Sequence, residues 1–224
     1  MTLHLASKKP SVIGVLDLQG GVHEHLVHLE SLGVAYKRVK QADDFADLAG
    51  LIIPGGESSC LARLLNIFEI KDVLLHAHQS GMKIWGTCAG AILLANKVVG
   101  ENSCLNLINI TIERNSFGSQ LDSFFSEAII PTVAAEPIPL TFIRAPKIID
   151  VGSDINVLLK IDDYIAAAEN ETILVTIFHP ELTGCLAFHR YFAMKCGLKI
   201  TSKSREHHDP FWKIWSWTKH AGIL

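Results

Sequence analysis

Short runs of consecutive apolar residues alternate along the first hundred positions with longer stretches in which apolar residues recur every three or four positions. A continuous apolar run is typical of a strand that is buried on both faces of a parallel sheet, where no side chain reaches water. The pattern predicts buried strands at residues 12–16, 50–53 and 83–86, and a shorter strand at 35–39.

The segments between these strands have the apolar spacing of helices that bury one face. Glycines or serines stand near their ends, as at helix caps. Helices are predicted at residues 23–32, at 61–68 with Ser58 or Ser59 as the N-cap, at 73–80, and directly after Cys88. The repeated order of strand and helix predicts an α/β fold, a doubly wound, mostly parallel sheet flanked by helices.

The pattern changes after residue 97. Ile108, Ile110 and Ile112 alternate with polar residues, which predicts a half-exposed strand. Several short strands are predicted up to residue 157, separated by residues 115–120 and by the proline-bearing stretch 131–139, and together they form a small antiparallel excursion attached to the main sheet. A hairpin at residues 165–177 and a helix at 186–196 complete the pattern.

Composition excludes some classes of function. The 224 residues carry a formal net charge of -3, which provides no basic field for nucleic acid. No apolar stretch has the length of a signal peptide or a membrane span, and the five cysteines are irregularly spaced, unlike a disulfide framework or a zinc site. We therefore expect a cytoplasmic protein without a metal site, whose partners are small molecules or proteins.

The domain is expected to cover residues 1–198. Residues 199–224 form a polar and then Trp-rich C-terminal tail that contains three of the four tryptophans. A short helix that docks its aromatic face on the domain is one interpretation, and a surface for a partner or for self-association is the other.

Cys88 is the strongest candidate for a nucleophile. It lies in Gly86-Thr87-Cys88-Ala89-Gly90, between a predicted strand and a predicted helix. A tight strand-to-helix turn leaves no room for bulky residues beside the nucleophile, and the positive end of the helix favours a thiolate. The alternative is a buried structural cysteine in a glycine-rich turn.

His179 and Glu181 are candidates for the base and for the group that orients it. They follow a predicted strand, and two positions along a strand share one face, so both could face Cys88 if the two strands are neighbours. The turn with Gly55 and Gly56 follows another buried strand. Amides of Gly55, Gly56 and Ala89 are predicted to form an oxyanion hole at the carboxyl edge of the sheet.

Three motifs resemble the signatures of class I (triad) glutamine amidotransferases, a family with a flavodoxin-like fold. Further motifs are similar to one branch of that family, the glutaminase subunits of pyridoxal 5'-phosphate synthases. The family motifs are Pro54-Gly55-Gly56-Glu57-Ser58, Gly86-Thr87-Cys88-Ala89-Gly90 and Phe178-His179-Pro180-Glu181-Leu182, and the branch motifs are Leu18-Gln19-Gly20, Arg114 with residues 115–120, and Phe142-Ile143-Arg144-Ala145-Pro146.

The resemblance implies hydrolysis of L-glutamine to glutamate and ammonia, without a cofactor. Cys88 would be the nucleophile, His179 would move the proton and Glu181 would hold His179. Ammonia would pass to a partner (β/α)₈ synthase subunit near Gln19. The residues implied to bind glutamine are Gly56, Glu57, Ser58, Arg114, Ile143 and Arg144.

Three positions depart from the family pattern, namely Asp17, Ser59 and Ala187. None belongs to the predicted triad. Two other functions stay open at this point: a catalytically silent regulatory partner of the synthase, and a different hydrolase that uses the same cysteine turn.

Overall fold

The computed structural model describes residues 11–114 and 123–200. Five of the strands in these residues pair in parallel in the spatial order β2, β1, β3, β4, β12. Every residue of β3 is buried, as are the last four residues of β1 and of β4, which confirms the predicted buried strands. The bounds are β1 (Val12–Leu16), β2 (Tyr36–Val39), β3 (Leu48–Ile53), β4 (Lys83–Thr87) and β12 (Ile173–Thr176).

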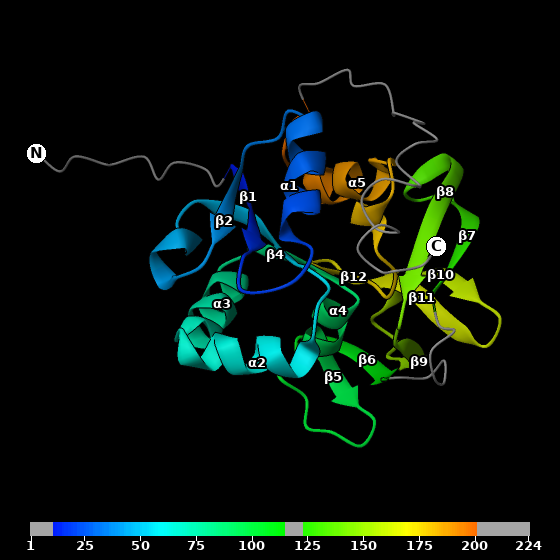
Figure 1. Ribbon diagram of the computed structural model, residues 1–224, viewed down its shortest axis with the longest axis horizontal. Helices are drawn as coiled ribbons and strands as arrows, with labels where there is room; N and C mark the ends of the chain where they lie inside the picture. The colour runs from blue at the N-terminus through cyan, green and yellow to red at the C-terminus, as the bar shows by residue number, and fades with distance from the viewer. Residues whose placement is uncertain (1–10, 115–122, 201–224) are drawn as a thin grey trace, which may run out of the picture.

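Helices cover both faces of this parallel region. The α-helices are α1 (Val22–Ser31), α2 (Ser58–Ile67), α3 (Ile70–Gln79), α4 (Ala89–Leu94) and α5 (Ala187–Lys195), and the 3-10 turns are η1 (Ala42–Phe45) and η2 (Pro180–Leu182). α1 and α5 lie together on one face, while α2, α3 and α4 lie on the other (Figure 1). This is the predicted doubly wound, mostly parallel α/β sheet.

The remaining strands of the main sheet extend it beyond β12. They are β5 (Ala95–Val98), β6 (Ile108–Glu113), β9 (Lys147–Val151), β10 (Asn156–Ile161) and β11 (Tyr164–Glu169). The order continues β12, β11, β9, β6, β5, with β10 attached to β11. Ile108, Ile110 and Ile112 are buried, which confirms the predicted half-exposed strand, and β11 and β12 form the predicted hairpin.

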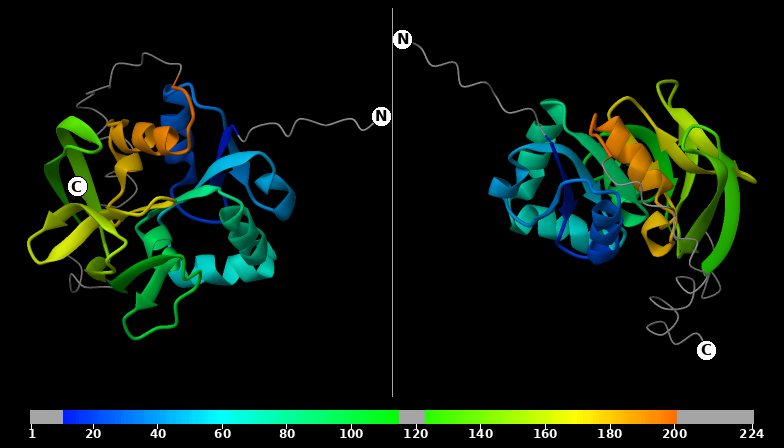
Figure 2. Two further views of the ribbon diagram at one scale, coloured as in Figure 1. Left: turned by 180° about the vertical axis from the view of Figure 1, so that it is seen from behind. Right: turned by 90° about the horizontal axis from the view of Figure 1, so that it is seen from above.

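The antiparallel excursion is confirmed, but its boundaries differ from the prediction. β7 (Ser123–Ile130) and β8 (Ala134–Ile143) form a separate two-stranded sheet at one end of the molecule (Figure 2). Only residues 131–133 of the proline-bearing stretch separate strands, because β8 begins at Ala134 and runs through Pro137 and Pro139. A strand with a single neighbour leaves half of its N–H positions unpaired, so it tolerates proline there.

The N-cap residue predicted for α2 was wrong. Glu57, not Ser58 or Ser59, is the N-cap, and its carboxylate accepts hydrogen bonds from the N–H groups of Ser59 and Cys60 at 3.2 and 2.6 Å. The longer side chain of Glu57 reaches these amides from the position before the helix. An acceptor at this point satisfies N–H groups that have no partner within the helix.

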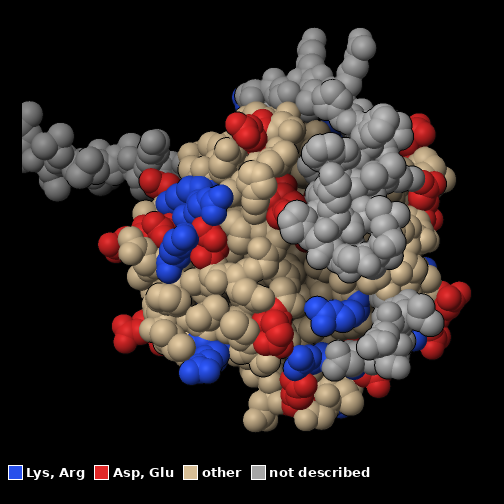
Figure 3. Space-filling view, viewed as in Figure 1, with Lys and Arg blue, Asp and Glu red and all other residues tan. Residues whose placement is uncertain are grey.

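Acidic and basic side chains are interspersed over the face of the molecule drawn in Figure 3, in keeping with a net charge of -3. Within residues 11–114 and 123–200, no helix combines the length and the apolar character needed to cross a bilayer. The docking helix and the interaction surface considered for the Trp-rich tail both fall on residues 211–224, outside the described part of the chain.

Candidate active site

Cys88 occupies a sharp turn between β4 and α4. Its backbone has φ 47° and ψ -103°, a conformation that residues with a side chain rarely adopt. The flanking glycines are required by space. A Cβ on Gly86 would lie 2.6 Å from the carbonyl carbon of Gly90, and a Cβ on Gly90 would lie 2.1 Å from the carbonyl oxygen of Ile53. The turn therefore has the strained geometry expected of a strand-to-helix nucleophile turn.

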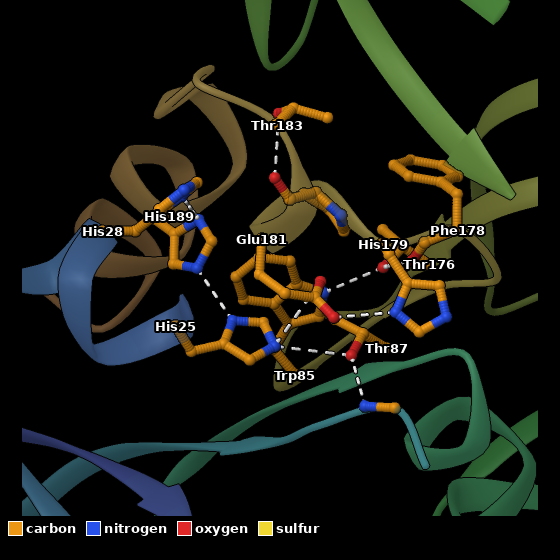
Figure 4. Close-up of polar contacts among 12 residues, drawn as sticks. His25, His28, Trp85, Thr87, Thr176, Phe178, His179, Glu181, Thr183 and His189 are labelled. Carbon is orange, nitrogen blue, oxygen red and sulfur yellow. Dashed lines mark hydrogen bonds and ion pairs between the residues drawn. The ribbon is translucent and has the colours of Figure 1, made fainter. Parts of the chain in front are cut away.

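His179 reaches Cys88 because β12 lies beside β4. The two strands are parallel neighbours, with Thr176 opposite Thr87, so the residues that follow them meet at one edge of the sheet. The imidazole of His179 and the side chain of Cys88 lie beside the same point above Gly55, where an added Cβ would be 2.3 Å from Cε1 of His179 and 3.3 Å from Cβ of Cys88. The Nδ1 atom of His179 lies 2.7 Å from Oε1 of Glu181 (Figure 4). The predicted neighbourhood of the two strands is thus confirmed.

Glu181 approaches His179 from a 3-10 turn. The sequence predicted that both residues share one face of an extended strand, and this was wrong, because β12 ends at Thr176 and η2 begins at Pro180. The ring of Pro180 fixes a backbone angle that suits the start of a helical turn. The turn, not the alternation of a strand, brings the carboxylate back to the imidazole.

The electrostatics around His179 favour its charged form and that of Glu181. Burial opposes an imidazolium at His179, but the Glu181 carboxylate and the Cys88 sulfur outweigh it and raise the pKa of His179 well above its usual value. Burial also opposes the carboxylate of Glu181, yet the imidazoles of His179 and His25 lower its pKa to about 2. The arrangement can hold a proton on His179 beside the cysteine sulfur.

The glycine turn after β3 lies against the same site. The N–H of Gly55 donates to Oγ1 of Thr87 at 2.9 Å, and the carbonyl of Gly55 accepts from the N–H of Gly21 at 3.2 Å. The amide of Gly55 is therefore already engaged in this arrangement. Gly56, and Ala89 at the start of α4, are the better placed candidates for an oxyanion hole.

A cavity of about 430 Å³ opens in front of these groups, a volume in the usual range for small-molecule sites. Its wall combines the cysteine turn, the glycine turn, the end of β8 and η2. All the residues that the sequence singled out for catalysis, glutamine binding or the oxyanion hole line it, namely Gly55, Gly56, Glu57, Ser58, Cys88, Ala89, Arg114, Ile143, Arg144, His179 and Glu181.

Two arginines stand at this cavity. Arg114 makes two hydrogen bonds to the carboxylate of Glu101, at 2.7 and 2.6 Å, and lies 3.5 Å from Glu57. These contacts fix the guanidinium at the cavity wall, with Nη1 facing Glu101 and Nη2 facing Glu57. Arg144 follows β8 with a left-handed φ of 42°, an unusual conformation for a residue with a side chain.

The sequence interpretation missed three supporting residues. Thr87 binds the amide of Gly55, Glu101 holds Arg114, and His25 faces the second oxygen of Glu181 at 3.7 Å. The sequence held one signal for them: His25 and His28 are three positions apart in a predicted helix, and such residues share a face. Nothing in the sequence pairs Glu101 with Arg114.

Curated relatives of the chain are subunits of one enzyme. The "Pyridoxal 5'-phosphate synthase subunit PdxT" of Syntrophus aciditrophicus is 57% identical over 220 residues, which cover 98% of each chain. The PdxT subunit of Clostridium kluyveri is 45% identical over 185 residues, covering 82% of this chain and 98% of the relative. The first alignment includes most of the segment after residue 200.

Solved structures agree in fold. A crystal structure of a glutamine amidotransferase has a TM-score of 0.78 at 36% identity and covers 83% of this chain and 98% of its own. The structure of PurLQS from Thermotoga maritima, at 18% identity and a TM-score of 0.59, shares the fold over 84% of this chain and 99% of its own. Residues 15–198, more than half of the chain, match the model of a single protein family. The chain belongs to the SNO glutamine amidotransferase family.

Proposed function

We propose that the chain hydrolyses L-glutamine to L-glutamate and ammonia and passes the ammonia to a synthase subunit that makes pyridoxal 5'-phosphate. One observation carries the proposal: His179 stands between Cys88 and Glu181, 2.7 Å from the carboxylate, at the wall of a cavity of amino-acid size. This is the nucleophile, base and orienting group that amide hydrolysis through a thioester requires.

In the first half-reaction the sulfur of Cys88 attacks the side-chain carboxamide carbon of glutamine, and His179 holds the thiol proton. The developing oxyanion accepts hydrogen bonds from the backbone amides of Gly56 and Ala89. When the tetrahedral intermediate collapses, the C–N bond breaks and the nitrogen takes the proton from His179. Ammonia leaves, and a γ-glutamyl thioester remains on the sulfur.

In the second half-reaction water attacks the thioester carbon while His179 accepts a proton from it. Collapse of this intermediate breaks the C–S bond, releases glutamate and returns the proton to the sulfur of Cys88. Glu181 stays ionised throughout, because its pKa of about 2 lies far below neutral pH. Its role is to orient His179 and to stabilise the imidazolium.

Recognition of glutamine requires partners for an α-carboxylate and an α-ammonium group. Arg114 offers a planar guanidinium for the carboxylate, and Arg144 adds a second cation. The carboxylate of Glu57 remains ionised, since hydrogen bonds from Ser59 and Cys60 lower its pKa, and it suits the ammonium group. Gly56, Ser58 and Ile143 complete the binding surface.

The partner is proposed from the relatives, whose names identify them as subunits of pyridoxal 5'-phosphate synthase. Ammonia released into water would be protonated and lost, so a closed path from Cys88 to a (β/α)₈ synthase subunit is useful. The loop with Gln19 lies beside the cavity, and its side-chain oxygen accepts the N–H of Glu57 at 2.9 Å. We therefore place the contact with the synthase at this loop.

The test measures glutamate release in the presence of the barrel subunit. Cys88→Ala is expected to lower kcat about a thousandfold, because the nucleophile is lost. Cys60→Ala is the matched control, since Cys60 is an exposed cysteine outside the cavity, and it should retain full activity. Equal activity of Cys88→Ala and wild type would reject the glutaminase and favour a silent regulatory partner.

A second measurement locates the nucleophile directly. A diazoketone analogue of glutamine should label one residue, and peptide mass spectrometry should identify it as Cys88. Label on another cysteine would contradict the mechanism. Turnover by the isolated chain at the rate of the complex would show that the synthase does not activate the site.

A further inference from the structure

A row of three buried histidines lies behind Glu181, on the side opposite His179 (Figure 4). His25 and His28 come from α1 and His189 comes from α5, and all three are fully or almost fully buried. His189 lies 2.8 Å from Nδ1 of His25 through its Nε2 atom and 3.0 Å from Nδ1 of His28 through its Nδ1 atom. None of the three takes part in the proposed chemistry.

One end of this row faces the catalytic groups. Oε2 of Glu181 is buried without a hydrogen-bond partner among the described residues, and it lies 3.7 Å from Nε2 of His25. The same nitrogen lies 3.5 Å from Oγ1 of Thr87, which accepts the N–H of Gly55. A single ring nitrogen therefore faces both the carboxylate of the triad and the support of the glycine turn.

The carboxylate decides which nitrogens carry protons. A neutral imidazole has one N–H group and one lone pair, so hydrogen bonds along the row must run in one direction. A lone pair on Nε2 of His25 would be repelled by Glu181, so Nε2 carries the proton. Nδ1 of His25 then accepts from Nε2–H of His189, and Nδ1 of His189 accepts from His28.

The three rings are neutral at neutral pH. Burial lowers the pKa of His25 and that of His189, and burial together with His25 lowers the pKa of His28 to about 4. The ionisable groups around His25 are Glu181 and Glu24, which favour its charged form, and His179 and the other two rings of the row, which oppose it.

The other end of the row does not reverse this direction. There the backbone carbonyl of Thr183 is a second acceptor, for an N–H of His28, since the N–H of Thr183 is taken by Pro180. Three neutral rings carry three N–H groups for four contacts, so one end of the row goes without a proton. A backbone group carries no net charge, whereas Glu181 is ionised and is the stronger acceptor. In addition, no group of three side chains in the described part of the chain is arranged to hold a metal ion, so the row is a chain of hydrogen bonds.

We propose that His25 is a positioning residue for the amide hydrolysis: its Nε2–H holds Oε2 of Glu181 and Oγ1 of Thr87, and His189 keeps that proton on Nε2. Through these contacts the carboxylate stays turned toward His179. Hydrogen bonds in active sites without substrate are commonly long and tighten in the complex. The inference rests on the proposed glutaminase function and extends it to residues that do not touch the substrate.

The test compares three variants. His25→Gln keeps an N–H group near the position of Nε2, whereas His25→Asn is too short to place its amide there. His23→Ala removes an exposed histidine from the same helix, is not part of the cavity wall, and serves as the control. Thermal unfolding of each variant measures the effect on packing separately.

Two readouts separate this proposal from the proposed function. The first is the pH dependence of Cys88 alkylation by iodoacetamide, located by peptide mass spectrometry because the exposed Cys60 would react as well. The alkylation rate reports whether the sulfur is protonated, and it requires no glutamine turnover. The second is kcat and KM for glutamate release in the complex with the barrel subunit.

His25→Asn is expected to move the midpoint of alkylation upward by about one pH unit, because the imidazolium of His179 loses part of its support. It should lower kcat about tenfold and leave KM within about twofold. His25→Gln and His23→Ala should resemble wild type in both readouts. A folded His25→Asn protein with the wild-type midpoint and kcat would overturn the proposal.

If no protein, wild type included, released glutamate, the glutaminase would be rejected, and the alkylation profile would still decide the role of His25. The wild-type protein offers a measurement that needs no stable Asn variant. ¹⁵N shifts of its histidine rings, assigned with the Gln variant, should identify the Nε2–H tautomer of His25 at pH 7. The Nδ1–H tautomer would contradict the inference.

Discussion

Gly90 makes the turn at Cys88 possible because, without a side chain, it lets the backbone at the end of β3 lie against the turn. The carbonyl oxygen of Ile53, at the end of β3, occupies the space that a side chain on Gly90 would need. Gly86 is limited in a different way, by the first turn of α4 and by Leu94. The backbone of Cys88 is therefore held by its neighbours in space as well as by its neighbours in sequence.

Gly90→Ala should lower the free energy of unfolding by at least about 2 kcal/mol, because the new Cβ would be 2.1 Å from backbone. Gly100→Ala is the control without a clash: nothing lies within 4 Å of its Cβ position, so only the strain of its positive φ of 75° remains and about 1 kcal/mol is expected. Urea unfolding of both variants measures the difference. Equal losses would show that the contact with Ile53 can relax.

Single residues differ in how far their sequence context predicts their role. The tight turn at Cys88 could be predicted, because the glycines on both sides indicate that there is no room for larger side chains. The engaged amide of Gly55 could not be predicted, because its partner Thr87 depends on how β3 and β4 align. The pairing of Arg114 with Glu101 likewise depends on the register of β5 and β6.

Among the helices, α2 links local stability to the cavity. Glu57 caps this helix through its carboxylate and also lines the cavity. The next helix, α3, has a glutamate at the same position, Glu69, whose side chain makes no capping hydrogen bond. The two helix starts therefore form a natural comparison between a capping and a non-capping glutamate.

Glu57→Ala should cost about 1 kcal/mol of stability, the usual loss for a helix cap, whereas Glu69→Ala should change it by less than about 0.5 kcal/mol. Denaturant unfolding of both proteins provides the comparison. Only the first substitution should also raise KM for glutamine, because Glu57 is proposed to bind the ammonium group. Similar losses of stability in both variants would argue against the cap.

Elements were predictable where the apolar pattern alone decides them. β1, β3, β4, β6 and the hairpin of β11 and β12 follow from their buried positions. β8 could not be predicted, because a strand tolerates Pro137 and Pro139 only if it has a single neighbouring strand. The turn η2 was not predicted either, since a strand and a 3-10 turn both bring positions 179 and 181 together.

Across the whole molecule, stability must depend on pH through the buried histidines. His28 keeps a pKa of about 4 in the folded chain against 6.5 when unfolded, so the unfolded state binds more protons between these values. Stability therefore falls as the pH drops from 6.5 toward 4. Glu181, with a pKa of about 2, adds a loss at lower pH, which begins below its unfolded value of 4.5.

His28→Gln should reduce the loss of stability between pH 7 and pH 4.5, because glutamine does not titrate. The full contribution of His28 is about 3 kcal/mol, reached when the pH falls below 4. Urea unfolding at several pH values measures the slope, with His76→Gln on an exposed position of α3 as control. A His28→Gln slope equal to that of wild type would contradict the assignment of a buried neutral ring.

The position of β12 has a consequence for the order in which the molecule is made. This strand lies between β4 and β11 in the sheet, although it comes from residues 173–176, close to the end of the domain. During synthesis Cys88 emerges from the ribosome long before His179, its proposed base. Contacts between such distant segments close late in folding. In a nascent or truncated chain the proposed nucleophile is thus a thiol without its base, and the two meet only when β12 enters the sheet.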